Sequence, residues 1–175
     1  MNYGVTLRTE RLTLRAPRPD DAAWIGCEIA RPEVHRWLTA VPRPYGLADA
    51  EDWIEANAGG SGAFVIDAGG DPLGALTLGA PGTAPELGYW LKRAAWGRGI
   101  MTEAARAALG WQFSRSDATV ASGHIVGNAA SRRVLAKLGF ADTGRVMRPS
   151  RFHGHDVEIQ RMILARATWE ANDAD

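Results

Sequence analysis

The segment WGRGIMTEAARAAL, at residues 96–109, constrains the fold more than any other part of the 175-residue chain. Its two glycines, Gly97 and Gly99, allow a tight backbone turn and a close approach of the backbone to a ligand. The helix predicted to follow, from Ile100 to Phe113, offers unpaired N–H groups and the positive end of its dipole. A glycine-containing loop that leads into a helix N-terminus is an anion site suited to a phosphate or a pyrophosphate.

Two other phosphate-binding motifs are disfavoured by the same segment. A dinucleotide-binding fingerprint would require glycine or alanine at position 102, where the chain has Thr102. A P-loop requires a Gly-Lys pair, and the sequence contains none. Because many strand–loop–helix joints contain two glycines, the alternative interpretation is a plain connection that carries a solvated Arg98.

Hydrophobic periodicity predicts a mixed α/β chain. Strands are expected at residues 6–15, 63–67, 72–78, 86–91, 118–126, from 140 onward and at 157–164. Helices are expected at residues 20–31, from Pro32, and at 47–57, 100–113 and 129–138. We expect a single domain over residues 1–170 and a frayed polar tail at 171–175.

A second motif lies downstream in IVGNAASRRVLAKLGF, residues 125–140. Asn128 falls where a strand ends, Ser131 in the first turn of a helix, and Gly139 at the end of that helix. This motif follows the opening segment LRTERLTLRAPR, the strand ELGYWL and the WGRG loop. In this order the segments resemble the GNAT superfamily of acyl-CoA-dependent N-acetyltransferases, over nearly the whole chain. The likeness is greatest to the subgroup of ribosomal-protein alanine and serine N-acetyltransferases.

The resemblance implies both a fold and an activity. The GNAT fold is an α/β fold with a twisted, mostly antiparallel mixed sheet, whose splayed central strands are flanked by helices. The implied activity is transfer of an acetyl group from acetyl-CoA to a primary amine, by direct attack in a ternary complex. The acceptor would be a protein N-terminus, an amino acid or another small amine. A homodimer is common in this family.

The family's loop motif, Gln/Arg-x-x-Gly-x-Gly/Ala, falls on residues 96–101, and Met101 replaces the usual small residue. By this resemblance the N–H groups of residues 98–102 hold the pyrophosphate of coenzyme A. The pantetheine arm would lie between the strands at 86–91 and 118–126. The residues implied for cofactor binding are Leu91, Gly97, Arg98, Gly99, Ile100, Met101, Thr102, Asn128 and Ser131. For Asn128, a cap of the following helix is an equal alternative.

Acetyl transfer to an amine needs a base for the amine proton, hydrogen-bond donors for the oxyanion and a proton for the departing thiolate. Glu86 is the first candidate base, because it begins a strand beside the proposed cleft, ten residues before Trp96. His124, on the opposite splayed strand, is the second candidate. The alternatives are a solvated carboxylate and a structural histidine. By family analogy, the backbone N–H groups near residues 89–91 are the oxyanion donors.

Many GNAT enzymes protonate the thiolate with a tyrosine seven residues after the asparagine, but Leu135 stands at that position here. The resembled subgroup offers Ser131 instead, as a hydrogen-bond partner of the sulfur. Its alternative role is to satisfy backbone donors of the helix. A glutamate proposed as the base in one branch of the subgroup falls at Ser150. These departures keep open a different function, that of a catalytically inactive acyl-CoA-binding module.

Trp37 and Tyr45 are the candidate acceptor contacts, because neighbouring prolines predict a loop near the acceptor pocket. The segment HGHD, residues 153–156, lacks the surrounding ligands of a zinc site, so no metal is expected. Cys27, the single cysteine, excludes an internal disulfide. Its apolar helical surroundings predict a core position.

The formal net charge is zero, from 20 Lys+Arg and 20 Asp+Glu, which gives no reason to expect a nucleic-acid or membrane-surface partner. Neither a signal peptide nor an apolar span is visible, so we expect a cytoplasmic protein. The zero is a cancellation: residues 1–87 carry 7 basic and 12 acidic side chains, and residues 88–175 carry 13 and 8. The basic half suits an anionic coenzyme, and the acidic half predicts an acceptor wall suited to a cationic amine.

Overall fold

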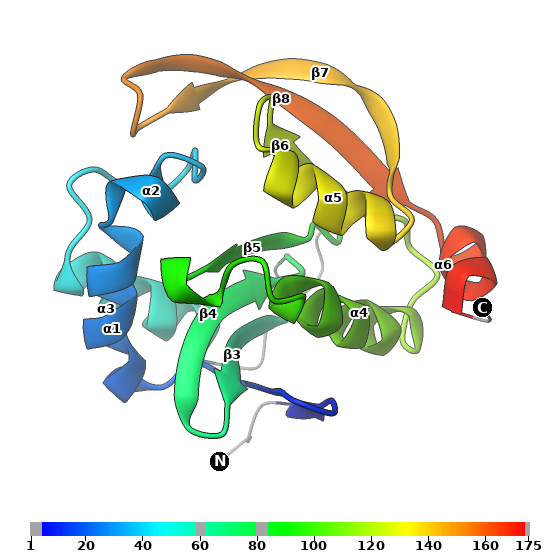
Figure 1. Ribbon diagram of the computed structural model, residues 1–175, viewed down its shortest axis with the longest axis horizontal. Helices are drawn as coiled ribbons and strands as arrows, with labels where there is room; N and C mark the ends of the chain where they lie inside the picture. Colours follow the sequence, from blue (N-terminus) through cyan, green and yellow to red (C-terminus); the bar gives the residue numbers. More distant parts are fainter. Residues whose placement is uncertain (1–4, 59–61, 80–83, 174–175) are drawn as a thin grey trace.

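The computed structural model describes residues 5–58, 62–79 and 84–173, and it contains two antiparallel sheets (Figure 1). The larger sheet has the order β1-β2-β3-β4-β5 and the smaller one the order β6-β8-β7. The strands of the larger sheet are β1 Leu7–Arg8, β2 Thr13–Arg15, β3 Ala63–Ala68, β4 Asp71–Thr77 and β5 Gly88–Leu91. Those of the smaller sheet are β6 Val120–Ile125, β7 Ala141–Ser150 and β8 His155–Leu164.

Six α-helices and two short 3₁₀ helices accompany the sheets in the described residues. The α-helices are α1 Ala22–Ile29, α2 Pro32–His35, α3 Leu47–Asn57, α4 Ile100–Phe113, α5 Ala129–Lys137 and α6 Arg166–Asp173. The 3₁₀ helices are η1 Pro19–Asp21 and η2 Arg93–Ala95. Figure 1 shows α1, α2 and α3 gathered at one end of the larger sheet, and the β7–β8 ribbon arching over α5. None of the helices in the described ranges has the length and hydropathy that a bilayer span requires.

The main core lies where α4 meets both sheets. Ala104, Ala105, Ala108 and Leu109 recur at helical spacing on one face of α4, and all four are fully buried. Three alanines on this face allow α4 to approach the strands closely, while the larger side chains come from the strands and from α5. This packing fixes the N-terminus of α4 beside β5, where the glycine loop ends.

The two sheets join at one point and then part. Leu87 N–H donates to Ala121 O at 2.8 Å, Ala121 N–H donates to Pro85 O at 2.9 Å, and Glu86 pairs in parallel with Ala121. The Ser122 hydroxyl adds a bond of 2.8 Å to Leu87 O. Beyond these residues β5 pairs with β4 and β6 pairs with β8. The predicted splay of two central strands in a mostly antiparallel α/β fold is therefore confirmed.

Three sequence predictions about the elements were wrong in detail. The single strand expected at residues 6–15 is two short strands around a turn, in which Thr9 N–H donates to Leu12 O at 2.9 Å. The strand expected from residue 86 begins at Gly88, because Glu86 makes an isolated bridge. Cys27 is exposed, because α1 buries its other face, which carries Ile25 and Ile29.

The C-terminal region holds a helix that the periodicity did not predict. Helix α6 runs to Asp173, so the first three residues of the expected tail are helical, and residues 174–175 lie outside the described residues. Trp169 is buried and stacks on Phe113 with ring centroids 5.9 Å apart. One large aromatic contact supplies the burial that stabilises this short segment as a helix.

Candidate active site

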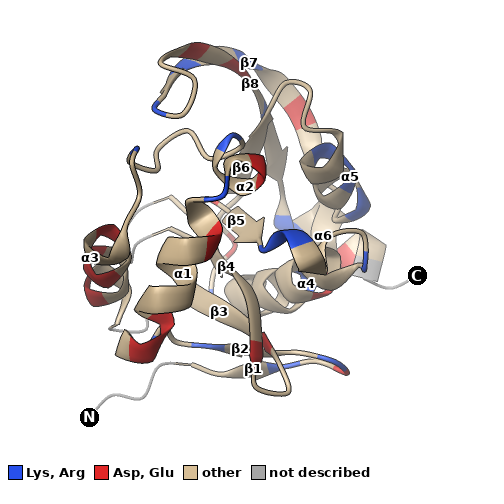
Figure 2. Ribbon diagram, turned by 60° about the vertical axis from the view of Figure 1, so that its left-hand side comes forward, with Lys and Arg blue, Asp and Glu red and all other residues tan. Residues whose placement is uncertain are grey.

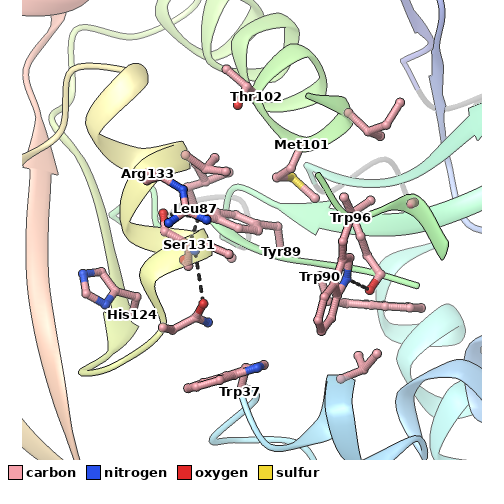
Figure 3. Close-up of a pocket in the computed structure, with 18 of the residues that line it drawn as sticks. Trp37, Leu87, Tyr89, Trp90, Trp96, Met101, Thr102, His124, Ser131 and Arg133 are labelled. Atoms are coloured by element: carbon pink, nitrogen blue, oxygen red, sulfur yellow. Dashed lines mark hydrogen bonds between the residues drawn. The ribbon is translucent and has the colours of Figure 1, made fainter. Parts of the chain in front are cut away.

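A cleft of about 450 Å³ opens where β5 and β6 part (Figure 3). One wall is β5 and the glycine loop, and the other is the end of β6 with the first turns of α5. Ten of the residues singled out from the sequence lie in its lining: Trp37, Leu91, Gly97, Gly99, Ile100, Met101, Thr102, His124, Asn128 and Ser131. The tertiary structure thus brings together two motifs that are about thirty residues apart in the chain.

The glycine loop is shaped by backbone that favours glycine. Gly97 and Gly99 have φ values of 72° and 74°, in the left-handed region that other residues adopt at a cost. The indole N–H of Trp96 donates to Leu91 O at 2.8 Å and ties the loop to β5. The N–H groups in the first turn of α4 have no carbonyl within that helix to bind, and they open onto the cleft. The loop therefore has the backbone geometry that an anion site requires.

The acidic residue in the first turn of α4 is held away from this anion site. Glu103 accepts hydrogen bonds from the Thr9 hydroxyl at 2.5 Å, from Arg11 N–H at 3.2 Å and from Arg11 Nε at 2.7 Å. Burial alone would raise the pKa of Glu103, but these bonds outweigh it and hold the pKa below its ordinary value. The β1–β2 turn thereby neutralises the carboxylate nearest the loop.

Backbone hydrogen bonds show which N–H groups of β5 face the cleft. In an extended segment, successive N–H groups point to opposite edges. Leu87 N–H donates to Ala121 O, toward β6, whereas Lys92 N–H donates to Leu73 O at 2.8 Å, toward β4. By this alternation the N–H groups of Tyr89 and Leu91 point toward β6, into the cleft.

At the start of α5, Asn128 is both a helix cap and a lining residue. Its Oδ1 accepts from Ser131 N–H at 3.1 Å, which confirms the capping alternative. Because Asn128 satisfies this donor, the Ser131 hydroxyl is not needed as a cap. The Ser131 Oγ instead lies 2.8 Å from the hydroxyl of Tyr89, which reaches across from β5 (Figure 3).

His124 presents an unsatisfied nitrogen in this cleft. The residue is 7% exposed, and its Nδ1 lies 3.0 Å from Ile125 O. A carbonyl oxygen accepts hydrogen bonds, so this contact assigns the proton of the neutral ring to Nδ1. The Nε2 atom is buried and has no hydrogen-bond partner among the described residues. A buried lone pair without a partner is unfavourable unless a bound molecule or water satisfies it.

Three of the sequence candidates do not line the cleft. Glu86 lies at the joint of the two sheets, where it pairs with Arg161 at 2.7 Å. The Arg98 side chain is exposed, and its carbonyl accepts from Arg11 at 3.3 Å. Tyr45 packs with α1 and α3, and burial followed by the charge of Asp49 raises its pKa to about 12.

One face of α5 contributes four lining residues, of which only Arg133 was among the basic residues expected from the sequence to meet an anionic coenzyme. Ala130, Arg133, Val134 and Lys137 follow the i, i+3, i+4, i+7 spacing of a helix face. That spacing was visible in the sequence and could have identified them. Neither Arg133 nor Lys137 pairs with a carboxylate in the described parts of the chain, and Figure 3 shows Arg133 on the cleft side of α5.

The remaining lining residues, whose side chains were not assigned to the cleft from the sequence, come from four regions. They are Val34 and Leu38 near α2, Leu87, Gly88, Tyr89 and Trp90 in and before β5, Ala95 and Trp96 before the loop, and Gly123 in β6. Tyr89 and Trp90 stand within the ELGYWL strand, so the strand pattern was the available signal. Its alternation could not show which face meets the cleft.

Three arginines lie beside the outer end of the cleft, next to its lining residue Trp37, where the sequence had predicted an acidic wall. Arg36 lies 4.9 Å above the Trp37 ring, and Arg43 lies 4.4 Å above the ring of Phe152 in the β7–β8 turn. Arg151 N–H donates to Thr39 O at 3.4 Å. These three arginines form no ion pair within the described residues. Figure 2 shows several acidic residues along α3, away from these arginines.

The histidines of the HGHD segment belong to the same basic end. The ring centroids of His153 and His155 are 5.7 Å apart, and Ser150 Oγ lies 2.9 Å from His153 Nδ1. Burial, and then the charges of His155, Arg36 and Arg43, lower the pKa of His153. No cluster of three or more His, Cys, Asp or Glu side chains within the described ranges is arranged to hold a metal ion. Ser150 is buried in the turn and does not line the cleft.

Comparison with known proteins gives a consistent result. The family described as acetyltransferase (GNAT) domain matches residues 11–141. The uncharacterised Bacillus subtilis protein YkkB is 31% identical, over 79% of this chain and 87% of its own length. YdaF of the same organism, whose name assigns it provisionally to ribosomal N-acetyltransfer, is 27% identical, over 92% of this chain and 94% of its own length.

A solved structure shares the fold. The ribosomal L7/L12 α-N-protein acetyltransferase RimL, solved in complex with coenzyme A, superposes with a TM-score of 0.78. It is 18% identical and covers 92% of this chain and 98% of its own. The family match over most of the sequence, the shared fold and the cleft between the parted strands agree. This chain belongs to the GNAT family of acetyltransferases and is an acyltransferase.

Proposed function

We propose that the protein transfers the acetyl group of acetyl-CoA to a primary amine by direct attack within a ternary complex. The observation that carries the proposal is the course of the cleft. It leads from the glycine loop and the N-terminus of α4, past the β5 N–H groups, to His124, whose buried Nε2 has no hydrogen-bond partner among the described residues. These groups would supply an anion site, oxyanion donors and a base along one cavity.

The described residues fit coenzyme A. The N–H groups around Gly99 and the first turn of α4 would hold the pyrophosphate. Arg133 and Lys137, without carboxylate partners on the α5 face, would add positive charge beside the phosphates. The inner part of the cleft, between β5 and β6, would take the pantetheine arm, with Asn128 at its edge.

The chemistry follows from the groups that line the inner cleft. The amine nitrogen attacks the thioester carbonyl carbon, and negative charge develops on the carbonyl oxygen. The N–H groups of Tyr89 and Leu91 point to this space and would stabilise that oxygen. His124, in its neutral form, would accept the amine proton directly or through one water. Glu86, the first candidate from the sequence, now ranks second, because it is outside the lining and pairs with Arg161.

The basic outer end of the cleft favours an acceptor amine that carries a negative charge. Arg36, Arg43 and Arg151 have no carboxylate partner in the described chain, and Arg36 covers Trp37, which lines the cleft. An anionic group on the acceptor would bind there while its amine enters toward His124. Free amino acids, or protein N-termini with acidic residues nearby, therefore fit better than polyamines.

The proposed function is tested by thiol release from acetyl-CoA over a panel of amines, with calorimetry for coenzyme A binding. We expect turnover, and a higher kcat/KM for alanine than for alaninamide, because the two differ in the carboxylate. A preference for alaninamide or spermidine would contradict the anionic acceptor. Tight coenzyme binding without turnover on any amine would support the inactive binding module instead. No binding at millimolar coenzyme A would overturn both functions.

Replacing His124 with glutamine should lower kcat about 10- to 100-fold at pH 7. The loss should shrink as the pH rises above 8, because an α-amine with an ordinary pKa near 8 then loses its proton without help. Glu86→Gln serves as the comparison and should change kcat less than His124→Gln. If Glu86→Gln instead lost more kcat than His124→Gln, and its loss shrank above pH 8, Glu86 would be the base.

A further inference from the structure

The cleft holds a tyrosine hydroxyl whose contacts the proposed function does not yet use. Tyr89 extends from β5 to the first turn of α5, where its hydroxyl lies 2.8 Å from Ser131 Oγ and 3.3 Å from Ser131 O. Both residues line the cleft, and the Tyr89 ring packs against the main core. Two ordered elements therefore fix this contact at the inner end of the cavity (Figure 3).

Either hydroxyl can donate in this contact, and the Tyr89 hydroxyl has a second acceptor in Ser131 O at 3.3 Å. Burial, only partly offset by the Ser131 contact, raises the pKa of Tyr89 to about 12, so the phenol stays protonated. A protonated phenol has one proton to donate, and the shorter contact leads to Ser131 Oγ. Ser131 N–H is already bound by Asn128 Oδ1. When Tyr89 donates to Ser131 Oγ, the serine proton is free to point into the cleft.

We propose that Tyr89 is a positioning residue that directs the Ser131 hydroxyl proton toward the sulfur of coenzyme A. This inference rests on the proposed function and adds a specific arrangement for its leaving group. The Tyr89–Ser131 pair would take the place of the tyrosine that many GNAT enzymes use for the thiolate. That position here holds Leu135, which is fully buried in the core. The hydroxyl group comes from the opposite wall of the cleft.

The amine nitrogen forms a bond to the carbonyl carbon, the C–S bond breaks, and the sulfur keeps the electron pair as a thiolate. Ser131 donates a hydrogen bond to that thiolate, and water finally protonates it, while the amine proton leaves through the base. An ordinary thiol has a pKa near 8.5, so its thiolate is too weak a base to deprotonate Tyr89. Tyr89 stays neutral throughout and acts through Ser131.

The direct test measures the pKa of the coenzyme A thiol in its complex with the protein, from thiolate absorbance between pH 6 and 10. This readout needs no acceptor amine. We expect the pKa of the bound thiol to lie about one unit higher in Ser131→Ala than in the wild type, and about half a unit higher in Tyr89→Phe. Equal thiol pKa values in all three complexes would overturn the inference.

Kinetics supply a second readout that a purely structural role would not move. Tyr89→Phe should lower kcat about tenfold and leave KM for acetyl-CoA unchanged, because the hydrogen bond to sulfur strengthens as the bond breaks. Tyr89→Phe combined with Ser131→Ala should lose no more than Ser131→Ala alone. Losses that multiply in the double variant would contradict action through Ser131. Ser131→Thr, which keeps the hydroxyl, should retain most of kcat.

Two controls separate this inference from stability and from the proposed function. Ser114→Ala removes a hydroxyl at the far end of α4, where Oγ donates to Trp111 O, and should match the wild type in kcat. Thermal unfolding of each variant checks the fold. If Tyr89→Phe proves unstable, 3-fluorotyrosine at position 89 keeps the ring and donates more strongly, so it should lower the thiol pKa. A wild type that does not bind coenzyme A would refute the proposed function itself.

Discussion

Replacing Gly99 with glutamate is expected to lower the affinity for acetyl-CoA about 100- to 1,000-fold. The substitution places a carboxylate at the N-terminus of α4, where the pyrophosphate would bind. A Cβ at Gly99 would meet Arg11 Nη2 at 3.6 Å, an ordinary contact, so the fold has room for the side chain. The φ of 74° adds local strain of about 1–3 kcal/mol, which reduces stability rather than affinity. Calorimetry with coenzyme A measures the effect.

Gly69→Glu is the matched control for this variant. Gly69 lies in the β3–β4 turn with a φ of 67°, and a Cβ there would meet nothing within 4 Å. The two variants therefore introduce the same side chain at a similar backbone angle, but Gly69 is outside the cleft lining. Gly69→Glu should lose stability and keep its affinity. An equal loss of affinity in both variants would show that strain, and not the anion site, explains the result.

Replacing Asp21 with alanine should destabilise the protein by about 3–5 kcal/mol. Asp21 is buried and binds the Arg15 guanidinium through two contacts of 2.8 Å. It also accepts from Arg18 N–H at 2.8 Å and from the Trp24 indole at 2.9 Å. Removing it leaves a largely buried guanidinium with a hydrogen bond to Ala16 O at 3.3 Å and, among the described residues, Asp67 at 3.8 Å as its remaining carboxylate partner. Urea denaturation of the two proteins measures the difference.

Asp20→Ala is the control, because Asp20 neighbours Asp21 in η1 but is exposed. It should change the free energy of unfolding by less than about 0.5 kcal/mol. A comparable loss in both variants would mean that the 3₁₀ helix, and not the buried ion pair, is the source. The comparison isolates the buried ion pair, because both residues are aspartates of the same 3₁₀ helix.

The stabilisation by Asp21 should also depend on pH. Burial would raise the pKa of Asp21, but the bonds from Arg15, Trp24 and Arg18 outweigh it and lower the pKa. A carboxylate with a lowered folded-state pKa stabilises the fold above its unfolded pKa, near 3.9. The difference in unfolding free energy between wild type and Asp21→Ala should be constant from pH 5 to 7. It should shrink as the pH falls below 4.

The elements that could be predicted from the sequence are those whose stability depends on local pattern. Helices α3, α4 and α5 and the β3–β4 hairpin carry apolar periodicity, glycine stops or a helix cap, and their predicted positions agree with the structure to within a residue or two. Helix α6 was missed, because its one strong signal is Trp169, whose partner Phe113 is distant in the chain.

In the candidate site, too, features set by local sequence could be predicted, and features set by distant contacts could not. Gly97 and Gly99 could be assigned to an anion site, because their positive φ angles and the helix N-terminus are local properties. The ion pair of Glu86 with Arg161 could not be predicted, since Arg161 lies on β8 and meets Glu86 where the two sheets join. The sign of charge at the outer cleft also required the structure, because the β7–β8 turn lies against residues 36–43 there.

By itself, the sequence determined the glycine loop, the capped α5, the family and the two strands between which the coenzyme is proposed to bind. Tertiary structure alone decided which side chains face that position. It pairs Tyr89 with Ser131, ties Glu86 to Arg161, and leaves Nε2 of His124 without a hydrogen-bond partner among the described residues. The physical reason is the separation along the chain over which each interaction acts. Backbone angles and helix caps depend on a few neighbouring residues, whereas hydrogen bonds across a cleft depend on how separate strands splay.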